Sequence, residues 1–144
     1  MANRKVLRIL VWVFVIGLIC AFSAIYYVFN MPRRNIAKEN AAYTLTAQQL
    51  MSDFKKDESA ANTKYLDKVI AVSGEIKGIR TLDNHSMVFS LEDAMEGVSC
   101  TVDSADVVKN ALKLSQLKSG SPGTFKGRCS GMLMDIQIIN SSPE

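Results

Sequence analysis

Three kinds of side chain in this 144-residue sequence have the chemistry of a functional site: thiols, an imidazole, and clustered charges. The cysteines are Cys20, Cys100 and Cys129, with no C-x-x-C pair among them, and His85 is the only histidine. A zinc or iron–sulfur site needs a denser set of sulfur and nitrogen ligands. The sequence therefore predicts no metal, no cofactor and no catalytic constellation, so we expect a protein that is not an enzyme.

Cys100 and Cys129 fall on the apolar faces of two predicted strands, residues 98–102 and 124–130. One interpretation is a disulfide formed after export, which would be structural. The other is a pair of buried free thiols, since cysteine is often fully buried. The two strands are not expected to be neighbours, so a bridge must cross the protein interior within about 7 Å between Cα atoms. Both interpretations stay open.

Four cations on two predicted strands are the candidate ligand-binding surface. If these strands pair, the cations form one strip that suits an anionic ligand such as nucleic acid, an acidic glycan or a lipid headgroup. An ordinary solvated face is favoured, because residues 43–144 carry 11 basic and 13 acidic residues, a net charge of −2. Exposed aromatic rings for base stacking are also missing, since Phe89 and Phe125 fit the core. The four cations are Lys77, Arg80, Lys126 and Arg128.

Two polar loops complete the set of candidates. His85 lies in a turn beside Asp83 and Asn84, where the sequence offers it no catalytic partner. The acidic loop 92–97 matches no calcium-binding spacing. We expect both loops to be solvated turns.

Residues 9–29 form a run of 21 residues without a charge. As a helix, the run would be about 31 Å long, which matches a hydrocarbon core of about 30 Å. A cleaved signal peptide is the alternative, with small residues around 21–24, but the apolar run continues to Phe29 and favours an uncleaved anchor. Cys20 is disfavoured as a lipoprotein cysteine because the bulky Ile19 precedes it.

The flanking charges do not fix the orientation of this span, because three cations precede it and three follow it. The short N-terminal tail favours a signal-anchor with the N-terminus in the cytoplasm and the folded domain outside, in the periplasm. The cations are Arg4, Lys5 and Arg8 before the span, and Arg33, Arg34 and Lys38 after it.

The predicted organisation is a cytoplasmic tail and transmembrane anchor at 1–29, a polar linker at 30–42 that Pro32 separates from the helix, and a folded domain at 43–144. The domain begins with an amphipathic helix. Thr46 and Gln49 have the spacing of a capping box. The predicted buried stripe of this helix is Leu50, Phe54, Ala61 and Tyr65.

The long stretch 68–81 predicts the strand around which the domain is built. Ile70, Val72 and Ile76 form its inward face, Gly74 marks a bend, and a bulge is expected near Gly78. Further strands are predicted at 87–91, 98–102, 124–130 and 133–139, followed by a polar tail. A second helix after residue 103 is predicted to bury Val108, Ala111 and Leu112.

Three strands, a helix and two strands is the order of the five-stranded OB-fold barrel, a mainly β fold. In that fold the helix between strands three and four plugs the open end of the barrel. Binding is expected through the loops that join strands one and two and strands four and five.

Several stretches in this order resemble the bacterial tRNA_anti-like (tRNA-anticodon-like) family. They are Asn-Met-Pro-Arg-Arg-Asn-Ile at 30–36, Tyr-Thr-Leu-Thr-Ala at 43–47, the run at 60–74, Val-Ser-Cys at 98–100, Leu-Lys-Ser-Gly at 117–120 and Gly-Arg-Cys-Ser-Gly at 127–131. The resemblance covers residues 30–139 and implies an OB barrel, often with an N-terminal membrane anchor. It implies no particular activity, because fold likeness does not transfer function.

Together these observations predict a membrane-anchored OB-fold binding module of the bacterial cell envelope that binds a protein partner or a small ligand. The alternative is a nucleic-acid-binding OB domain for single strands or tRNA-like ligands. That alternative requires a cytoplasmic domain and a cationic groove.

Overall fold

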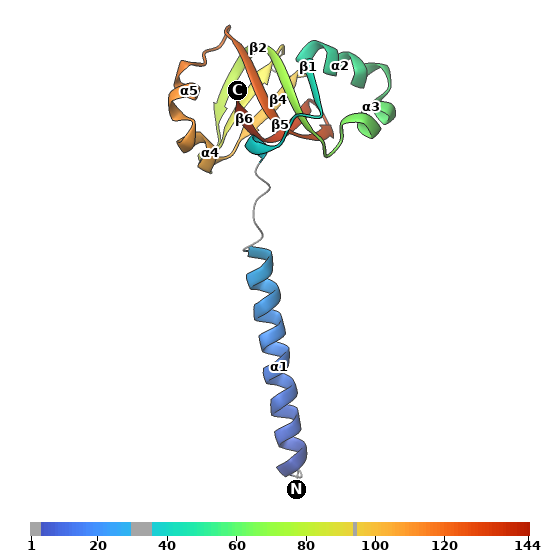
Figure 1. Cartoon of the computed structure of the whole chain (residues 1–144), viewed down its shortest axis with the longest axis vertical. Helices are drawn as coiled ribbons and strands as arrows, with labels where there is room; N and C mark the ends of the chain where they lie inside the picture. The colour runs from blue at the N-terminus through green and yellow to red at the C-terminus, as the bar shows by residue number, and fades with distance from the viewer. Residues whose placement is uncertain (1–3, 30–35, 94) are drawn as a thin grey trace. The chain divides into compact units, whose positions relative to one another are not determined.

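The computed structural model describes residues 4–29, 36–93 and 95–144 (Figure 1). It divides into two compact units, Met1–Arg34 and Asn35–Glu144. The helix stop predicted at Pro32 and the cations Arg33 and Arg34 lie outside the described residues.

The first unit is the helix α1 (Arg4–Phe29). Its segment Leu10–Val28 has a mean hydropathy of 2.3, and none of that segment is buried by other parts of the protein. By length and composition the helix is able to cross a membrane, and a signal sequence would have the same properties.

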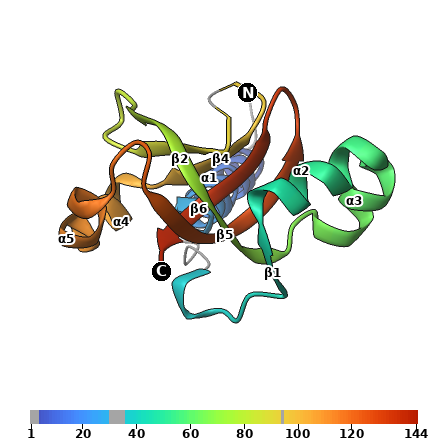
Figure 2. The same ribbon diagram turned by 90° about the horizontal axis from the view of Figure 1, so that it is seen from above.

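The second unit is built on a closed barrel of five strands (Figure 2). The strands follow the order β2-β3-β4-β6-β5, and β5 pairs back to β2. All pairs are antiparallel except β4 with β6. This arrangement confirms the predicted OB-type barrel. The strands are β2 (Val69–Thr81), β3 (Met87–Leu91), β4 (Val98–Val102), β5 (Pro122–Met132) and β6 (Ile136–Pro143).

The strand β2 closes the barrel because it serves two partners in succession. Residues 69–75 pair with β5, and residues 76–81 pair with β3. The register with β3 shifts between Ile76 and Gly78, which confirms the expected bulge. A bulge bends a strand and increases its twist, so β2 is able to pass from one partner to the other.

The barrel interior is filled by alternating side chains from all five strands. Ile70, Val72 and Ile76 are fully buried, as their spacing predicts. Phe89 and Phe125 meet in the centre with their ring centroids 4.8 Å apart. Both aromatic rings therefore belong to the core and are not available for stacking on a ligand.

An additional strand, β1 (Tyr43–Thr46), lies parallel to β2 and was not predicted from the sequence. It pairs with residues 70–73 of β2, a stretch that does not pair with β3. Before it, the short 3₁₀ helix η1 (Ile36–Lys38) buries Ile36 against β5 and β6. The described part of the segment expected to be a polar linker therefore belongs to the folded unit.

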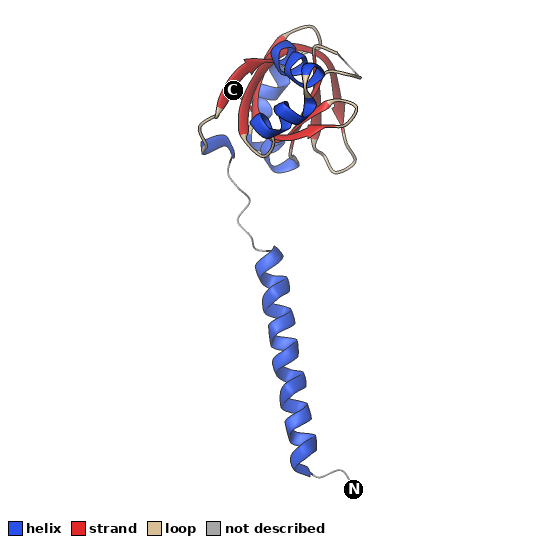
Figure 3. Cartoon of the chain, turned by 90° about the vertical axis from the view of Figure 1, so that its right-hand side faces the viewer, coloured by secondary structure: helices blue, strands red, loops and turns tan. Residues whose placement is uncertain are grey.

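The predicted amphipathic helix forms two helices, α2 (Ala47–Lys56) and α3 (Glu58–Tyr65), which lie across one side of the barrel (Figure 3). The capping box is present: the Gln49 amide donates to Thr46 Oγ1 at 3.2 Å, and the Thr46 amide donates to Gln49 Oε1 at 3.1 Å. Asp57 ends α2 and caps α3. The predicted stripe is buried, and Ala47 joins it.

The segment between β4 and β5 forms two short helices, α4 (Ser104–Lys109) and α5 (Ala111–Gln116). The predicted face is wrong, because Val108, Ala111 and Leu112 are exposed and Leu114 is the buried residue. Two apolar stripes compete on this segment, and the stripe that contains Leu114 packs on the barrel. The helices α2 and α3 bury far more side chains in the core than this segment, so the expected plug between strands three and four contributes little.

The predicted polar tail is also part of the barrel. The strand β6 continues to Pro143 and pairs with β5, and the buried Ser141 hydroxyl donates to the Thr101 carbonyl at 2.8 Å. Small polar residues are tolerated there because neighbouring backbone groups satisfy their hydrogen bonds.

We expect Gly74→Val to lower the free energy of unfolding by about 1–3 kcal/mol through overpacking. A Cβ atom at Gly74 would lie 3.1 Å from the Ala47 Cβ and 3.1 Å from Glu92 Oε1. The matched control is Gly78→Val in the same strand, where a Cβ would be 3.7 Å from its nearest neighbour. Denaturant unfolding measures both variants. Equal stabilities for the two would contradict a close packing of α2 on Gly74.

Candidate binding groove

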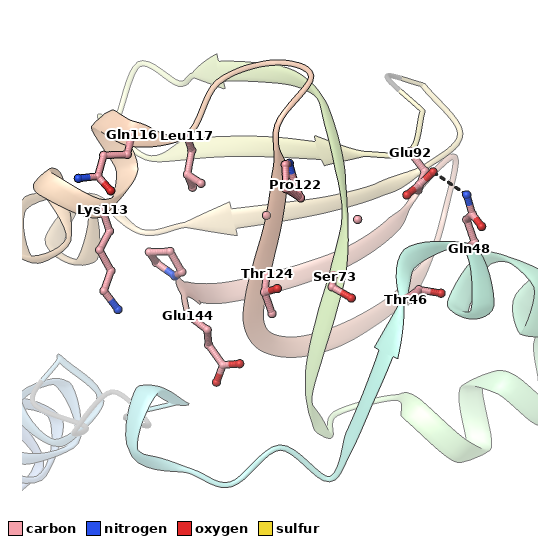
Figure 4. Close-up of a pocket in the computed structure, with 13 residues that line it drawn as sticks. Thr46, Gln48, Ser73, Glu92, Lys113, Gln116, Leu117, Pro122, Thr124 and Glu144 are labelled. Atoms are coloured by element: carbon pink, nitrogen blue, oxygen red, sulfur yellow. Dashed lines mark hydrogen bonds between the residues drawn. The ribbon is translucent and has the colours of Figure 1, made fainter.

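A solvent-open groove of about 760 Å³ crosses the seam between β2 and β5 (Figure 4). One wall comes from α5 and the other from the start of α2 and the loop after β3. Its volume falls in the range of small-molecule sites. The lining residues on which its chemistry depends are Thr46, Gln48, Ser73, Glu92, Lys113, Gln116, Leu117, Thr124 and Glu144.

The floor of the groove is a row of hydroxyl side chains on three adjacent strands. Thr46 on β1 is opposite Ser73 on β2, and Ser73 is opposite Thr124 on β5. The Thr46 hydroxyl accepts the helix-cap hydrogen bond, and the other two hydroxyls are half-exposed. The next row is Gly74 opposite Gly123, so the floor there is backbone without side chains. A flat, polar floor of this kind suits an extended ligand.

Glu92 fixes one wall. Its side chain accepts hydrogen bonds from the Gln48 amide nitrogen at 3.0 Å and from the Glu75 backbone at 3.2 Å. Its own amide donates to the Glu75 carbonyl at 2.8 Å, and its φ of 64° places it in the left-handed region. These contacts tie the loop after β3 to β2 and α2. The carboxylate is therefore a structural brace at the rim of the groove.

The side chains that line the groove carry a small net negative charge. Among the described lining residues, Glu92 and Glu144 carry carboxylates and Lys113 carries the ammonium group. Amides, hydroxyls and backbone groups make up most of the remaining polar surface. A phosphate backbone needs several cations, so this groove suits a neutral or cationic polar ligand better.

The four predicted cations do not form one strip. Lys126 is opposite Ala71 and Arg128 is opposite Val69, in the half of β2 that pairs with β5. Lys77 and Arg80 lie in the other half of β2, beyond the end of that pairing. The sequence correctly places both strands side by side, but it does not show where their pairing ends.

Three of these cations are adjacent to carboxylates. Ion pairs join Lys77 to Glu75 at 2.8 Å, Arg128 to Asp67 at 3.1 Å, and Lys126 to Glu144 at 3.4 Å. The hydrogen bond with Glu75 raises the pKa of Lys77. The charge of these cations is therefore balanced locally, and the Lys126 side chain is only 15% exposed.

Cys100 and Cys129 are buried free thiols in the structure. Both lie opposite Ile138, Cys100 on one side of β6 and Cys129 on the other. Two strand spacings amount to about 9.5 Å, which exceeds the Cα separation of a disulfide. Burial raises the pKa of both thiols, so neither is an activated nucleophile.

The two loops agree with the expected solvated turns. His85 is exposed, and its amide donates to the Leu82 carbonyl at 2.9 Å. The Asp93 carboxylate accepts hydrogen bonds from the amides of Met95 and Glu96, which lower its pKa. These bonds shape the loop. Among the described residues no group of three potential ligands is placed to hold a metal ion.

A cation–aromatic cluster beside β1 was missed by sequence reasoning, because its members are distant in the chain. The Tyr65 hydroxyl donates to Asp53 at 2.6 Å, and Lys64 lies 3.3 Å from the same carboxylate oxygen. Tyr43 meets Tyr65 edge to face at 5.3 Å. The hydrogen bond from Tyr65 lowers the pKa of Asp53, and burial raises the pKa of Tyr65. The cluster holds α3 to α2 and β1.

We expect Tyr65→Phe to lower the free energy of unfolding by about 1 kcal/mol at pH 7, because it removes the hydrogen bond to Asp53. That bond keeps the folded-state pKa of Asp53 below the unfolded value of about 3.9. Its contribution is therefore present above about pH 4 and is lost as the pH falls through the folded-state pKa. Thermal unfolding from pH 7 to pH 3 should show the difference from wild type shrinking in acid. The control Tyr43→Phe should give a difference that does not change with pH, and a constant difference for Tyr65→Phe would contradict this account.

The closed five-stranded barrel, its bulged first strand and its flanking helices define an OB-fold domain, a class whose members include binders of oligonucleotides and oligosaccharides. The chain belongs to the tRNA_anti-like family, whose pattern it matches over residues 1–143. No curated protein matches the sequence significantly.

Solved structures with the same fold include a lipoprotein of Klebsiella pneumoniae subsp. pneumoniae MGH 78578 that is provisionally described as nucleic acid-binding. It is 21% identical, with a TM-score of 0.54, and the match covers 70% of this chain and 90% of that one. The match to a chain of the S. pombe Stn1-ten1 complex covers 53% of this chain and 57% of that one, at 11% identity and a TM-score of 0.40. The match to the asparaginyl-tRNA synthetase of Entamoeba histolytica covers 54% of this chain and 20% of that one, at 13% identity and a TM-score of 0.41.

Proposed function

We propose that this protein is a membrane-tethered binding module that takes an extended, uncharged or cationic segment of a partner protein in the groove over β2 and β5. The observation that carries the proposal is the chemistry of the groove. Its floor offers the hydroxyls of Ser73 and Thr124, and its walls offer the amides of Gln48 and Gln116. Such groups exchange hydrogen bonds with a peptide backbone or with polar side chains.

The tether in this proposal is α1, retained as a signal-anchor with the N-terminus in the cytoplasm. Its apolar segment Leu10–Val28 supports the anchor by length and hydropathy. The folded unit then acts in the cell envelope as a non-enzymatic binding domain. The Glu92 carboxylate at the rim of the groove has a structural role in this proposal, because it accepts hydrogen bonds from Gln48 and from the Glu75 backbone.

Photocrosslinking in the cells that produce the protein tests the groove. We expect p-benzoylphenylalanine at Thr124 to give one defined protein adduct, and the same group at Thr63, an exposed position on α3, to give none. Filling the floor with Ser73→Tyr should abolish the adduct, whereas Ser59→Tyr on α3 should leave it unchanged. An adduct from both positions, or one that survives Ser73→Tyr, would count against the groove as the binding site.

Nucleic acid is the second candidate, and the description of the Klebsiella lipoprotein is the observation that favours it. The acidic balance of the groove and the ion pairs of Lys77, Lys126 and Arg128 weigh against it. Binding through phosphates would weaken steeply with salt.

Fluorescence anisotropy of a labelled 20-nucleotide single strand with the full chain in detergent separates the two candidates. We expect no binding at micromolar protein in 20 mM salt. Salt-dependent binding that is lost in the double variant Lys126→Glu/Arg128→Glu and retained in Lys55→Glu/Lys56→Glu would establish a nucleic-acid site and overturn the first proposal.

A further inference from the structure

We propose that the α4–α5 segment is a second membrane contact, which docks onto the surface of a bilayer that contains anionic lipids. This inference rests on the proposed anchoring through α1, and it assigns a second role to a segment whose helix α5 also lines the groove. It follows from three features of the segment: its exposed apolar side chains, its local charge and its place in the folded unit.

The segment presents apolar side chains to solvent that its sequence pattern would bury. Val108 is 78% exposed and Leu112 is 84% exposed. Asn110 is the residue at which α4 ends and α5 begins: its amide donates to the Asp106 carbonyl, and its own carbonyl accepts from the Leu114 amide. Val108 belongs to α4 and Leu112 to α5, so each helix exposes one large apolar side chain. The buried Leu114 attaches the segment to the barrel and leaves Val108 and Leu112 exposed.

The charge of this surface suits anionic headgroups. Residues 107–118 contain three lysines and no acidic residue, although residues 43–144 carry a net charge of −2. Lys109 is well exposed and has Asp106 as a partner at 3.4 Å, and Lys113 and Lys118 are also exposed. Apolar side chains flanked by lysines are typical of helices that lie in the membrane interface. Each lysine near an anionic surface strengthens binding about fivefold.

The chain enters the folded unit through η1, at the end of the unit where α4 also lies (Figure 1). The buried Ile36 fixes η1 against β5 and β6. Phe29 and Ile36 are seven steps apart along the chain, so their Cα atoms can be at most about 25 Å apart. A bilayer that holds α1 is therefore always within a short distance of the folded unit, which raises the effective concentration of lipid surface.

A matched apolar surface elsewhere provides the control. Leu133 and Met134 are 81% and 82% exposed in the turn between β5 and β6. This turn is next to Val98, at the opposite end of β4 from the start of α4. Asp135 lies in this turn, and the Ile136 amide donates to the carbonyl of Gly97, the last residue of the acidic loop 92–97, so an anionic surface would repel it.

Hydrogen–deuterium exchange of the full chain in nanodiscs tests the contact. With discs of phosphatidylcholine and phosphatidylglycerol, we expect amides at 104–117 to exchange about tenfold more slowly than in discs of phosphatidylcholine alone. The variant Val108→Ser/Leu112→Ser and the variant Lys109→Glu/Lys113→Glu should each remove this protection. The control Leu133→Ser/Met134→Ser should keep it.

Each outcome distinguishes docking from anchoring. A chain that stays with the discs but shows equal exchange in both lipids would overturn the docking and leave the anchor intact. A chain that separates from the discs would contradict both. Protection that appears equally without anionic lipid, or that rises with the number of chains per disc, would mean that a second copy covers the segment and would overturn the lipid assignment.

Discussion

The pairing of β2 with β5 is the interaction on which the rest of the folded unit depends. It closes the sheet into a barrel, so the long strand has a partner along its whole length. It also brings Gly74 opposite Gly123, and the missing side chain at Gly74 lets Ala47 of α2 pack against the strand. The helices that cover the barrel are therefore positioned by a backbone approach that only small residues allow.

The groove is a consequence of the same closure. Its floor is the seam itself, and its walls are the elements that the seam brings to either side, α5 and the start of α2. Because the floor belongs to a closed sheet, its hydroxyls and backbone groups are held in place before a ligand arrives, which reduces the entropy lost on binding. The absence of a cationic strip follows from the strand register, since Lys77 and Arg80 lie where β2 has already left β5.

Short sequence patterns correctly predicted those elements that depend on residues close together in the chain. The capping box of Thr46 and Gln49, the inward face of Ile70, Val72 and Ile76 and the bulge at Gly78 all follow from short-range chemistry. The strand β1 escaped prediction because four residues form a strand only beside a partner that the chain reaches later. The face of α4–α5 was wrong because two apolar stripes compete and tertiary packing selects Leu114. The groove and the cluster around Tyr65 combine residues distant in sequence, so no spacing could indicate them.

Native-state hydrogen exchange across the β2–β5 seam is the most direct test of the central claim, that this closure organises the domain. If the account is right, seam amides such as those of Val72 and Phe125 exchange only through global unfolding, with a free energy of opening equal to that measured by denaturant. If these amides open at a much lower free energy than those of β3 and β4, the barrel is not held by the seam, and the groove is not a preformed site.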